Sequence, residues 1–171
     1  PCPPGSFFPS VGAKNRSLCS PCYPGQYQEQ EGQEACRPCA PGTFSAAYGS
    51  TACDSCASGG YCASTAAASL ALAYTPCAAG RYNPLRGGSN ESYCLACPFG
   101  TALSGGARDR SQCGACPPGL YQPLAGQPVC LLCPQGAFST SAGSTACEAC
   151  PPGMASAASG SESSANCAEC T

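Results

Sequence analysis

The cysteines are the residues of this chain that could do the most chemistry. Nineteen of the 171 residues are Cys, and most of them stand in Cys-x2-Cys pairs. This spacing occurs in four-Cys zinc sites, in redox-active dithiols and in disulfide scaffolds. The pairs lie at positions 19/22, 36/39, 53/56, 94/97, 113/116, 130/133, 147/150 and 167/170.

Zinc and redox chemistry both fit the pattern poorly. Neighbouring loops share each Cys-x2-Cys pair, so separate four-Cys sites would have to skip alternate loops. Nineteen Cys do not divide into groups of four, and Lys14 is the only Lys available to offset thiolate charge. A redox-active pair needs a helix N-terminus in a βαβ setting to lower its thiol pKa, and the sequence predicts neither. We therefore expect no metal and no cofactor.

Catalytic side chains are scarce. The chain has no His, so neither a Ser-His-Asp nor a Cys-His arrangement can form. The carboxylates are scattered without the ligand spacing of a calcium loop, and we interpret them as solvated surface charge. No enzyme is predicted. The carboxylates considered are Glu29, Glu31 and Glu34 in one loop, and Asp54, Glu148 and Glu169 between paired Cys.

Charge and hydropathy exclude two further classes of function. Seven basic residues face nine acidic ones without any basic cluster, so nucleic-acid binding is not predicted. No apolar run approaches the roughly 20 residues of a membrane span; the closest, 66–73, is far too short. The chain opens Pro1-Cys2 without an initiating Met, and we interpret it as a mature or partial chain.

The Cys pairs mark an internal repeat. Nine units each begin at an opening Cys, which is the second Cys of a pair in seven units and Cys2 or Cys77 in the other two. Gly stands three residues after it in all nine units, an aromatic residue five after it in seven, and a second Gly ten after it in seven. The chain is therefore predicted to be a tandem array. The predicted repeats 1 to 9 are 2–21, 22–38, 39–55, 56–76 (irregular, with an Ala-rich insert), 77–96, 97–115, 116–132, 133–149 and 150–169, and 170–171 begins a further repeat.

Each recurring position has a physical reason. Openings such as Cys22-Tyr-Pro-Gly25 predict a type II turn, because Pro presets the second residue and Gly accepts the positive φ of the third. The aromatic residue follows on a short extended segment, where it is expected to cover its own repeat's disulfide. The later Gly predicts a hairpin turn. The predicted fold is a small, disulfide-rich, elongated tandem array of short β-loop units with little regular secondary structure.

Crosslinks must hold these repeats together, because one buried ring stabilises by about 5 kcal/mol at most, far less than ordering a repeat costs in entropy. If each opening Cys bonds the Cys that closes its loop, Cys170 has no partner. A rival pairing joins Cys62 to Cys77 and shifts the register downstream, and sequence alone does not fix connectivity. The sequential bridges are Cys2–Cys19, Cys22–Cys36, Cys39–Cys53, Cys56–Cys62, Cys77–Cys94, Cys97–Cys113, Cys116–Cys130, Cys133–Cys147 and Cys150–Cys167.

The run Cys-Pro-Pro-Gly-x-[Phe/Tyr]-x8-Cys-x2-Cys resembles the ephrin-receptor-like cysteine-rich repeat, which is kin to the first submodule of tumour-necrosis-factor-receptor repeats. The variant Cys56-Ala-Ser-Gly-Gly-Tyr-Cys62 … Pro76-Cys77 resembles another form of that repeat. In the receptor family this submodule closes its loop by a single bridge, which favours the sequential pairing. The family spans receptors, matrix proteins and protist surface antigens, so the resemblance implies a fold more than a function. The Ala/Ser/Gly-heavy loops are also similar to those of mastigoneme proteins, which form filaments on green-algal cilia.

Two sequons point to the secretory route. Asn15-Arg16-Ser17 and Asn90-Glu91-Ser92 both place Asn 13 residues after an opening Cys and four before the closing one. Equal placement predicts exposed loop tips and N-glycosylation at Asn15 and Asn90. Asp109-Arg110-Ser111 stands at the matching place without the Asn.

Two segments depart from the pattern. Residues 63–76 predict either a short helix with its N-cap at Ser64 or Thr65, ending before Pro76, or a bulged loop. An apolar set in repeat 7 is larger than one small repeat needs, and either seats the neighbouring repeat or contacts another protomer. This set is Leu120, Leu124, Val129, Leu131 and Leu132.

The function predicted from these features is an extracellular structural spacer or filament subunit whose glycosylated repeats assemble laterally into a surface or ciliary fibre. Its partners would be other protein subunits, including copies of itself. The alternative is the stalk or ligand-binding ectodomain of a cell-surface receptor or protist surface antigen.

Peptide mapping without reductant tests the pairing. Proteolysis of the oxidised protein should release peptides linked through Cys22–Cys36 and Cys39–Cys53, since each ring closes within its repeat. A peptide linked through Cys22 and Cys39 would refute sequential pairing, and one linked through Cys62 and Cys77 would support the rival register.

Overall fold

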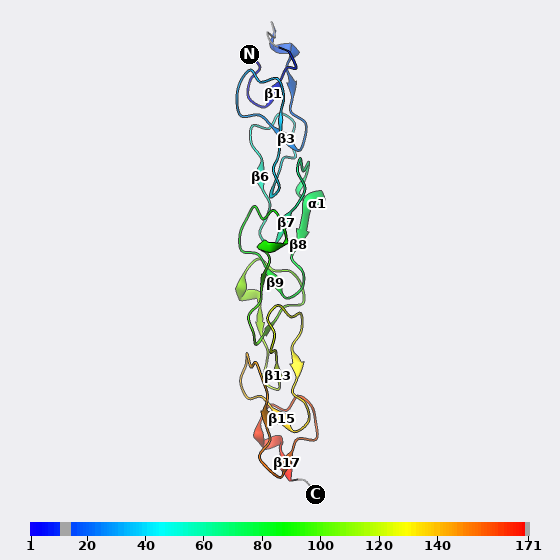
Figure 1. The fold of residues 1–171 in the computed structure, drawn as a ribbon, viewed down its shortest axis with the longest axis vertical. Coiled ribbons are helices and arrows are strands. Elements are labelled where there is room, and N and C mark those ends of the chain that lie inside the picture. Colours follow the sequence, from blue (N-terminus) through cyan, green and yellow to red (C-terminus); the bar gives the residue numbers. More distant parts are fainter. Residues whose placement is uncertain (11–14, 170–171) are drawn as a thin grey trace. The chain divides into compact units, whose positions relative to one another are not determined.

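The computed structural model describes residues 1–10 and 15–169, in two compact units. Unit 1 contains Pro1–Pro76 and Asn83–Tyr93, and unit 2 contains Cys77–Tyr82 and Cys94–Thr171. Each predicted repeat contains one small two-stranded antiparallel sheet, and within each unit these sheets follow one another in chain order (Figure 1). The predicted fold class, a disulfide-rich tandem array of short β-loops with little regular secondary structure, is confirmed.

Eight of the nine sheets in the described residues have the same construction. One strand follows the opening turn, and its partner is the two residues between the Cys of the next pair. In the irregular repeat 4 the partner strand instead ends directly before Cys77, which belongs to no such pair. In unit 1 the pairs are β1 (Ser6–Phe7) with β2 (Ser20–Pro21), β3 (Gln26–Tyr27) with β4 (Arg37–Pro38), β5 (Thr43–Phe44) with β6 (Asp54–Ser55), and β7 (Gly60–Cys62) with β8 (Tyr74–Pro76). In unit 2 they are β9 (Arg81–Tyr82) with β10 (Leu95–Ala96), β11 (Thr101–Ala102) with β12 (Gly114–Ala115), β13 (Leu120–Tyr121) with β14 (Leu131–Leu132), β15 (Ala137–Phe138) with β16 (Glu148–Ala149), and β17 (Met154–Ala155) with β18 (Ala168–Glu169).

The opening turns are as expected. The Gly three residues after each opening Cys, which we call the turn glycine, has φ between 73° and 90° in all nine repeats. In the second repeat the Gln26 N–H donates to the Tyr23 carbonyl at 3.0 Å, which closes a four-residue turn. Pro24 and Gly25 occupy the two central positions, as the type II geometry requires.

Helical structure is confined to short pieces. Four 3₁₀ turns precede the closing Cys of the longer loops: η1 (Arg16–Leu18), η2 (Glu91–Tyr93), η3 (Arg110–Gln112) and η4 (Ser164–Asn166). The insert of repeat 4 contains α1 (Leu70–Ala73), whose N-cap is Ser69, with its side chain accepting from the Leu72 N–H at 3.3 Å. The predicted N-cap at Ser64 or Thr65 is therefore wrong. The helix is shorter than expected because residues 74–76 pair as β8 with β7.

The interior consists largely of the disulfides themselves. Eight of the nine opening Cys are 3% exposed or less. The aromatic residues five positions after the opening Cys are less buried. All of them are half-buried except Phe138, which is 7% exposed. Phe44 packs against the buried cluster of the following repeat, which consists of Cys56, Cys62, Ala67 and Ala73. The neighbouring repeat therefore contributes to the interior around this ring.

Candidate functional site

The recurring site of this chain is the joint between successive repeats. The turn glycine of each repeat donates its N–H to the carbonyl of the residue six positions after the next opening Cys, which we call the inner position. In unit 1 these bonds run from Gly5 to Gln28, Gly25 to Ser45, Gly42 to Cys62 and Gly59 to Asn83, at 2.7–2.8 Å. In unit 2 they run from Gly80 to Leu103, Gly100 to Gln122, Gly119 to Ser139 and Gly136 to Ser156, at 2.7–3.1 Å.

A second backbone bond joins the repeats in the opposite direction. The residue ten positions after an opening Cys, which we call the tenth position, donates its N–H to the carbonyl of the preceding opening Cys. Examples are Gly49 to Cys22 and Gly126 to Cys97, at 2.8 and 2.9 Å. Repeat 6 is the exception, because its tenth residue, Ala107, donates to Arg81 at 3.2 Å instead.

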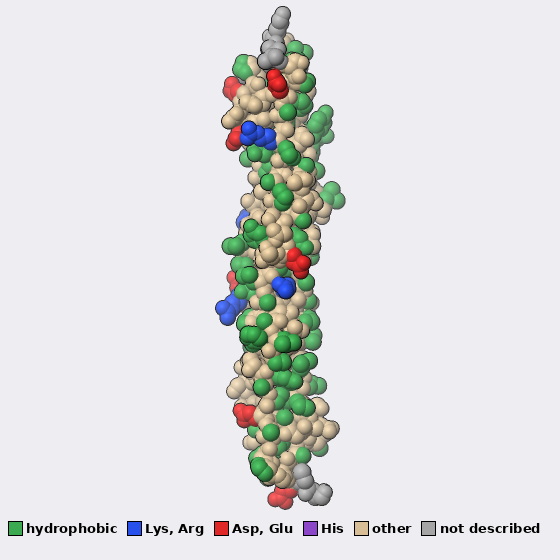
Figure 2. All heavy atoms as spheres, viewed as in Figure 1, with side chains coloured by type: hydrophobic (Ala, Val, Ile, Leu, Met, Phe, Trp, Pro, Cys, Tyr) green, Lys and Arg blue, Asp and Glu red, His purple; other side chains and the backbone are tan. Residues whose placement is uncertain are grey.

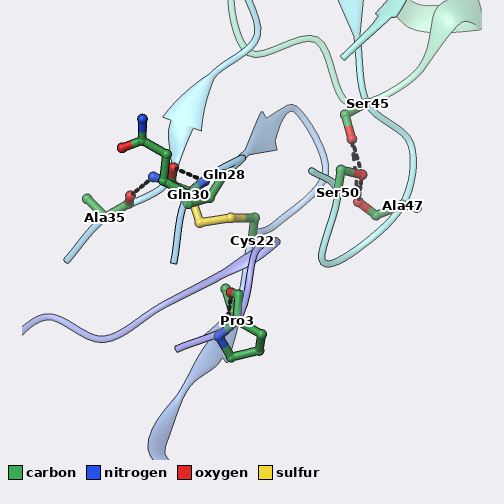
Figure 3. The surroundings of a disulfide bond; sticks show 10 residues. Pro3, Cys22, Gln28, Gln30, Ala35, Ser45, Ala47 and Ser50 are labelled. Atoms are coloured by element: carbon green, nitrogen blue, oxygen red, sulfur yellow. Dashed lines mark hydrogen bonds between the residues drawn. A yellow bond between two sulfur atoms is a disulfide. The ribbon is translucent and has the colours of Figure 1, made fainter. Parts of the chain in front are cut away.

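The inner position carries a buried polar side chain in most repeats, which the sequence had not led us to expect. Gln28 is 1% exposed and donates from Nε2 to the Ala35 carbonyl at 2.8 Å beside the Cys22–Cys36 disulfide (Figure 3). Ser45, at 2%, bonds the Ser50 hydroxyl at 2.6 Å. Such bonds let polar groups lie in an interior that is too small for apolar packing.

A sequence signal for this position exists in hindsight. Three Ser at the inner position have a second Ser five residues later, and each such pair is hydrogen-bonded. The pairs are Ser45 with Ser50, Ser139 with Ser144, and Ser156 with Ser161. Aligning the repeats by their polar residues, as well as by Cys, Gly and aromatic residues, would have identified the inner position.

Turn glycines also contact the repeat after next. A Cβ built on Gly5 would lie 2.1 Å from the carbonyl oxygen of Gly49, and one on Gly119 would lie 2.4 Å from that of Gly160. Repeats 1, 2, 3, 5, 6 and 7 are thus each in contact with the two repeats that follow them. In repeat 4 the contacting tenth residue is Ala66, which adopts φ 54° without being glycine.

The expected disulfide partners lie together in the structure. Those within unit 1 are Cys2–Cys19, Cys22–Cys36, Cys39–Cys53 and Cys56–Cys62, and those within unit 2 are Cys77–Cys94, Cys97–Cys113, Cys116–Cys130, Cys133–Cys147 and Cys150–Cys167. Each bond closes within one repeat, so covalent bonds other than the main chain do not cross these joints. Cys170 lies outside the described residues.

The two sequon Asn residues cap 3₁₀ turns. Asn15 and Asn90 are exposed, and their side-chain oxygens accept from the N–H of Ser17 at 3.2 Å and of Ser92 at 2.9 Å. Asp109 and Ser163 cap η3 and η4 in the same way. Capping alone therefore gives a structural reason for a small polar residue at this position.

Asp109 is the one capping residue that titrates. The Ser111 backbone N–H, and then the Ser111 hydroxyl, donate to its carboxylate and hold its pKa below the ordinary value. Because the folded-state pKa is lowered, this cap is fully formed above the ordinary carboxyl pKa and is lost as the pH falls through the lowered one.

Acidic groups and small depressions form no reactive cluster. Glu31 and Glu34 are exposed, and Glu29 makes an exposed ion pair with Arg37 at 3.6 Å, which contributes little to stability. Asp54, Glu148 and Glu169 are exposed on strands.

Over residues 1–10 and 15–169 no group of three or more His, Cys, Asp or Glu could hold a metal ion. A shallow depression in repeat 9 has Glu162 as its single carboxylate.

The apolar set of repeat 7 lies largely on the surface. Leu124, Val129 and Leu132 are each 59% exposed and Leu131 is 44% exposed, while Leu120 is half-buried. Leu132 nevertheless lies against repeat 9, because a Cβ built on Gly160 would be 2.8 Å from its Cδ2 atom. Figure 2 shows that charged side chains are sparse on the visible face and that apolar ones are scattered over it.

Two alanine substitutions separate backbone strain from contact between repeats. Gly119 and Gly136 have nearly equal φ of 81° and 79°, but within the described chain nothing lies within 4 Å of a Cβ built on Gly136. Gly136→Ala should cost about 1–2 kcal/mol from left-handed strain. Gly119→Ala should cost about 1–3 kcal/mol more, because its Cβ overlaps the Gly160 carbonyl.

The measurement is the free energy of unfolding of each oxidised variant in denaturant. Gly105→Ala is the control, because its Cβ would meet no atom within 4 Å and its φ is not left-handed. Equal losses at Gly119 and Gly136 would contradict a contact between a repeat and the one after next.

Comparison with known proteins supports part of the expected resemblance. A family model described as "Tyrosine-protein kinase ephrin type A/B receptor-like" matches residues 100–146 and, overlapping them, 129–167. The matched residues lie in repeats 6 to 9 and make up less than half of the chain. No curated protein matches the chain with significant similarity. In the described residues no helix is long and apolar enough to cross a membrane. The match and the nine disulfides together indicate a cysteine-rich repeat protein of extracellular type.

Proposed function

We propose that this chain is an extracellular structural spacer or filament subunit, without catalytic activity, whose repeats assemble laterally into a surface or ciliary fibre. The observation that carries the proposal is the joint, because the same backbone bonds recur from repeat to repeat within each unit. A binding or catalytic protein concentrates unusual side chains at one place. Here the unusual geometry is shared by nearly every repeat, as in repeat proteins generally.

The joint leaves the side-chain surface free for other contacts. Its hydrogen bonds use backbone groups, and its polar side chains are buried at the inner position. Exposed apolar side chains then remain available for lateral association with other subunits. In unit 2 those above 40% exposure are Leu95, Phe99, Leu124, Val129, Leu131 and Leu132. The similarity of the loops to those of mastigoneme proteins supports placing such a fibre on a cilium.

A receptor or surface-antigen ectodomain is the second candidate. It is favoured by the family match over residues 100–146 and 129–167, because the description of that model names a receptor. In this case the repeats would form a stalk or present a ligand site. The two candidates differ in whether the native protein is recovered in fibres or, with detergent, from membranes.

Self-assembly of the secreted, oxidised chain tests the first candidate. Sedimentation and negative-stain microscopy should show laterally aligned fibres whose amount increases with protein concentration. Combined replacement of Leu124, Val129, Leu131 and Leu132 by Ser should abolish or strongly reduce assembly, because it removes the most exposed apolar side chains of repeat 7.

Leu72→Ser is the matched control, since Leu72 is 87% exposed but lies in unit 1. Unchanged non-reducing peptide maps would show that both variants are folded. A chain that stays monomeric at every concentration, or a fourfold variant that assembles like the parent, would contradict lateral assembly through this surface.

Glycosylation at Asn15 and Asn90 is part of the proposal and is supported by their exposure. Asp109→Asn would complete a third Asn-x-Ser sequon at the same capping position, and should add a third N-glycan in a eukaryotic host. Asp109→Ser is the control, because it keeps a capping side chain without a sequon. Intact mass before and after N-glycosidase treatment measures the outcome. Secretion without glycan at Asn15 and Asn90 would contradict this part of the proposal.

A further inference from the structure

The joint between repeats 2 and 3 carries an exposed pair of tyrosines. The Tyr23 and Tyr48 rings meet edge to face with their centroids 5.7 Å apart. Tyr23 is 57% exposed and Tyr48 is 64% exposed. Of the other tyrosines, Tyr93 is 36% exposed and the rest are half-buried. Two aromatic rings in contact would ordinarily be shielded from water, and this pair is not.

The position of the pair follows from the joint. Tyr23 follows Cys22, whose carbonyl accepts from the N–H of Gly49, and Tyr48 precedes Gly49. One ring thus comes from each side of a joint hydrogen bond of 2.8 Å. At the equivalent places of the other joints the sequence has Pro, Ala, Gly, Ser, Thr, Glu or Arg and no aromatic residue. The pair is therefore not required for the joint to form.

We propose that Tyr23 and Tyr48 are a site of oxidative coupling, where a haem peroxidase using hydrogen peroxide joins them into an intrachain dityrosine. Hydrogen peroxide takes one electron and one proton from each phenol and becomes two molecules of water. The two phenoxyl radicals form a carbon–carbon bond between the ring carbons ortho to the oxygens. The hydrogens of those two carbons then move to the phenol oxygens, so that the chain loses two hydrogen atoms overall.

The surroundings favour this reaction over competing oxidations. The chain has no Trp and no His, and Met154 is its single Met. The Cys residues that the structure describes are all in disulfides. Among the described residues the phenols are therefore the main oxidisable groups, and the two most exposed of them are already side by side. Rotation about the side-chain bonds of two exposed residues is enough to bring the ring edges together.

The product would add what the disulfides do not supply. Each disulfide closes within one repeat, so the joint of repeats 2 and 3 is held by the main chain and by hydrogen bonds. A Tyr23–Tyr48 bond would fix that joint covalently. This inference rests on the proposed extracellular structural role, in which resistance to separation of repeats is useful.

The experiment treats the purified, oxidised chain with horseradish peroxidase and hydrogen peroxide. The expected product is a monomer that has lost two hydrogen atoms, with blue dityrosine fluorescence and, after reduction and digestion, one peptide pair joined through Tyr23 and Tyr48. Tyr23→Phe and Tyr48→Phe should each abolish this product. Both variants retain the ring and its contact, so the fold should be preserved. Tyr93→Phe is the control and should leave the yield unchanged.

Three results would overturn the proposal: no coupling under conditions that couple free tyrosine, coupling mainly between chains, or coupling at another tyrosine. These outcomes are independent of fibre assembly. Failure to couple leaves the structural role standing, and failure to assemble leaves the coupling chemistry unaffected.

Discussion

The hydrogen bond from a turn glycine to the inner position of the next repeat is the interaction on which the rest of the structure depends. It recurs at 2.7–3.1 Å within both units. The turn glycine needs a left-handed backbone, and its missing Cβ leaves room for the tenth residue of the repeat after next. Side chains larger than hydrogen would close that space. The glycine register is therefore a requirement of contact between repeats as well as of the turn.

Disulfides and joints have complementary roles. Each disulfide closes one loop and fills most of its interior, since the opening Cys are almost completely buried. Loop closure of about 15 residues stabilises by about 3 kcal/mol in the chain-entropy model, which compensates for the small apolar core. The joints then align closed loops mainly through backbone hydrogen bonds, with a few side-chain contacts such as the Asn83 Nδ2 donation to the Gly60 carbonyl. Because neither the disulfides nor the joint hydrogen bonds depend on exposed side chains, the surface can vary from repeat to repeat.

The period, the turns and the fold class could be predicted from the sequence, because Cys, Gly and Pro at fixed spacing restrict a backbone strongly. The polar inner position was missed, since amide residues such as Gln28 and Asn83 alternate there with Ser such as Ser45, and polar residues of these types are ordinarily exposed. Ala66 was missed for a related reason: a non-glycine residue at φ 54° does not stand out in sequence. The start of α1 was wrong because Ala66 adopts φ 54° and donates its N–H to the Cys39 carbonyl of the preceding repeat, so a helix cannot continue through it from Ser64 or Thr65.

The central claim is that each disulfide closes the loop of its own repeat. When the two ends of the chain are pulled apart, the disulfides therefore carry the force and the loops do not extend. Single-molecule stretching between the two ends tests it most directly. With the disulfides intact, the stretched chain should reach only roughly 200 Å, because the loops are bypassed, and after reduction it should reach roughly 600 Å. An extension close to the fully reduced length in the absence of reductant would contradict sequential ring closure.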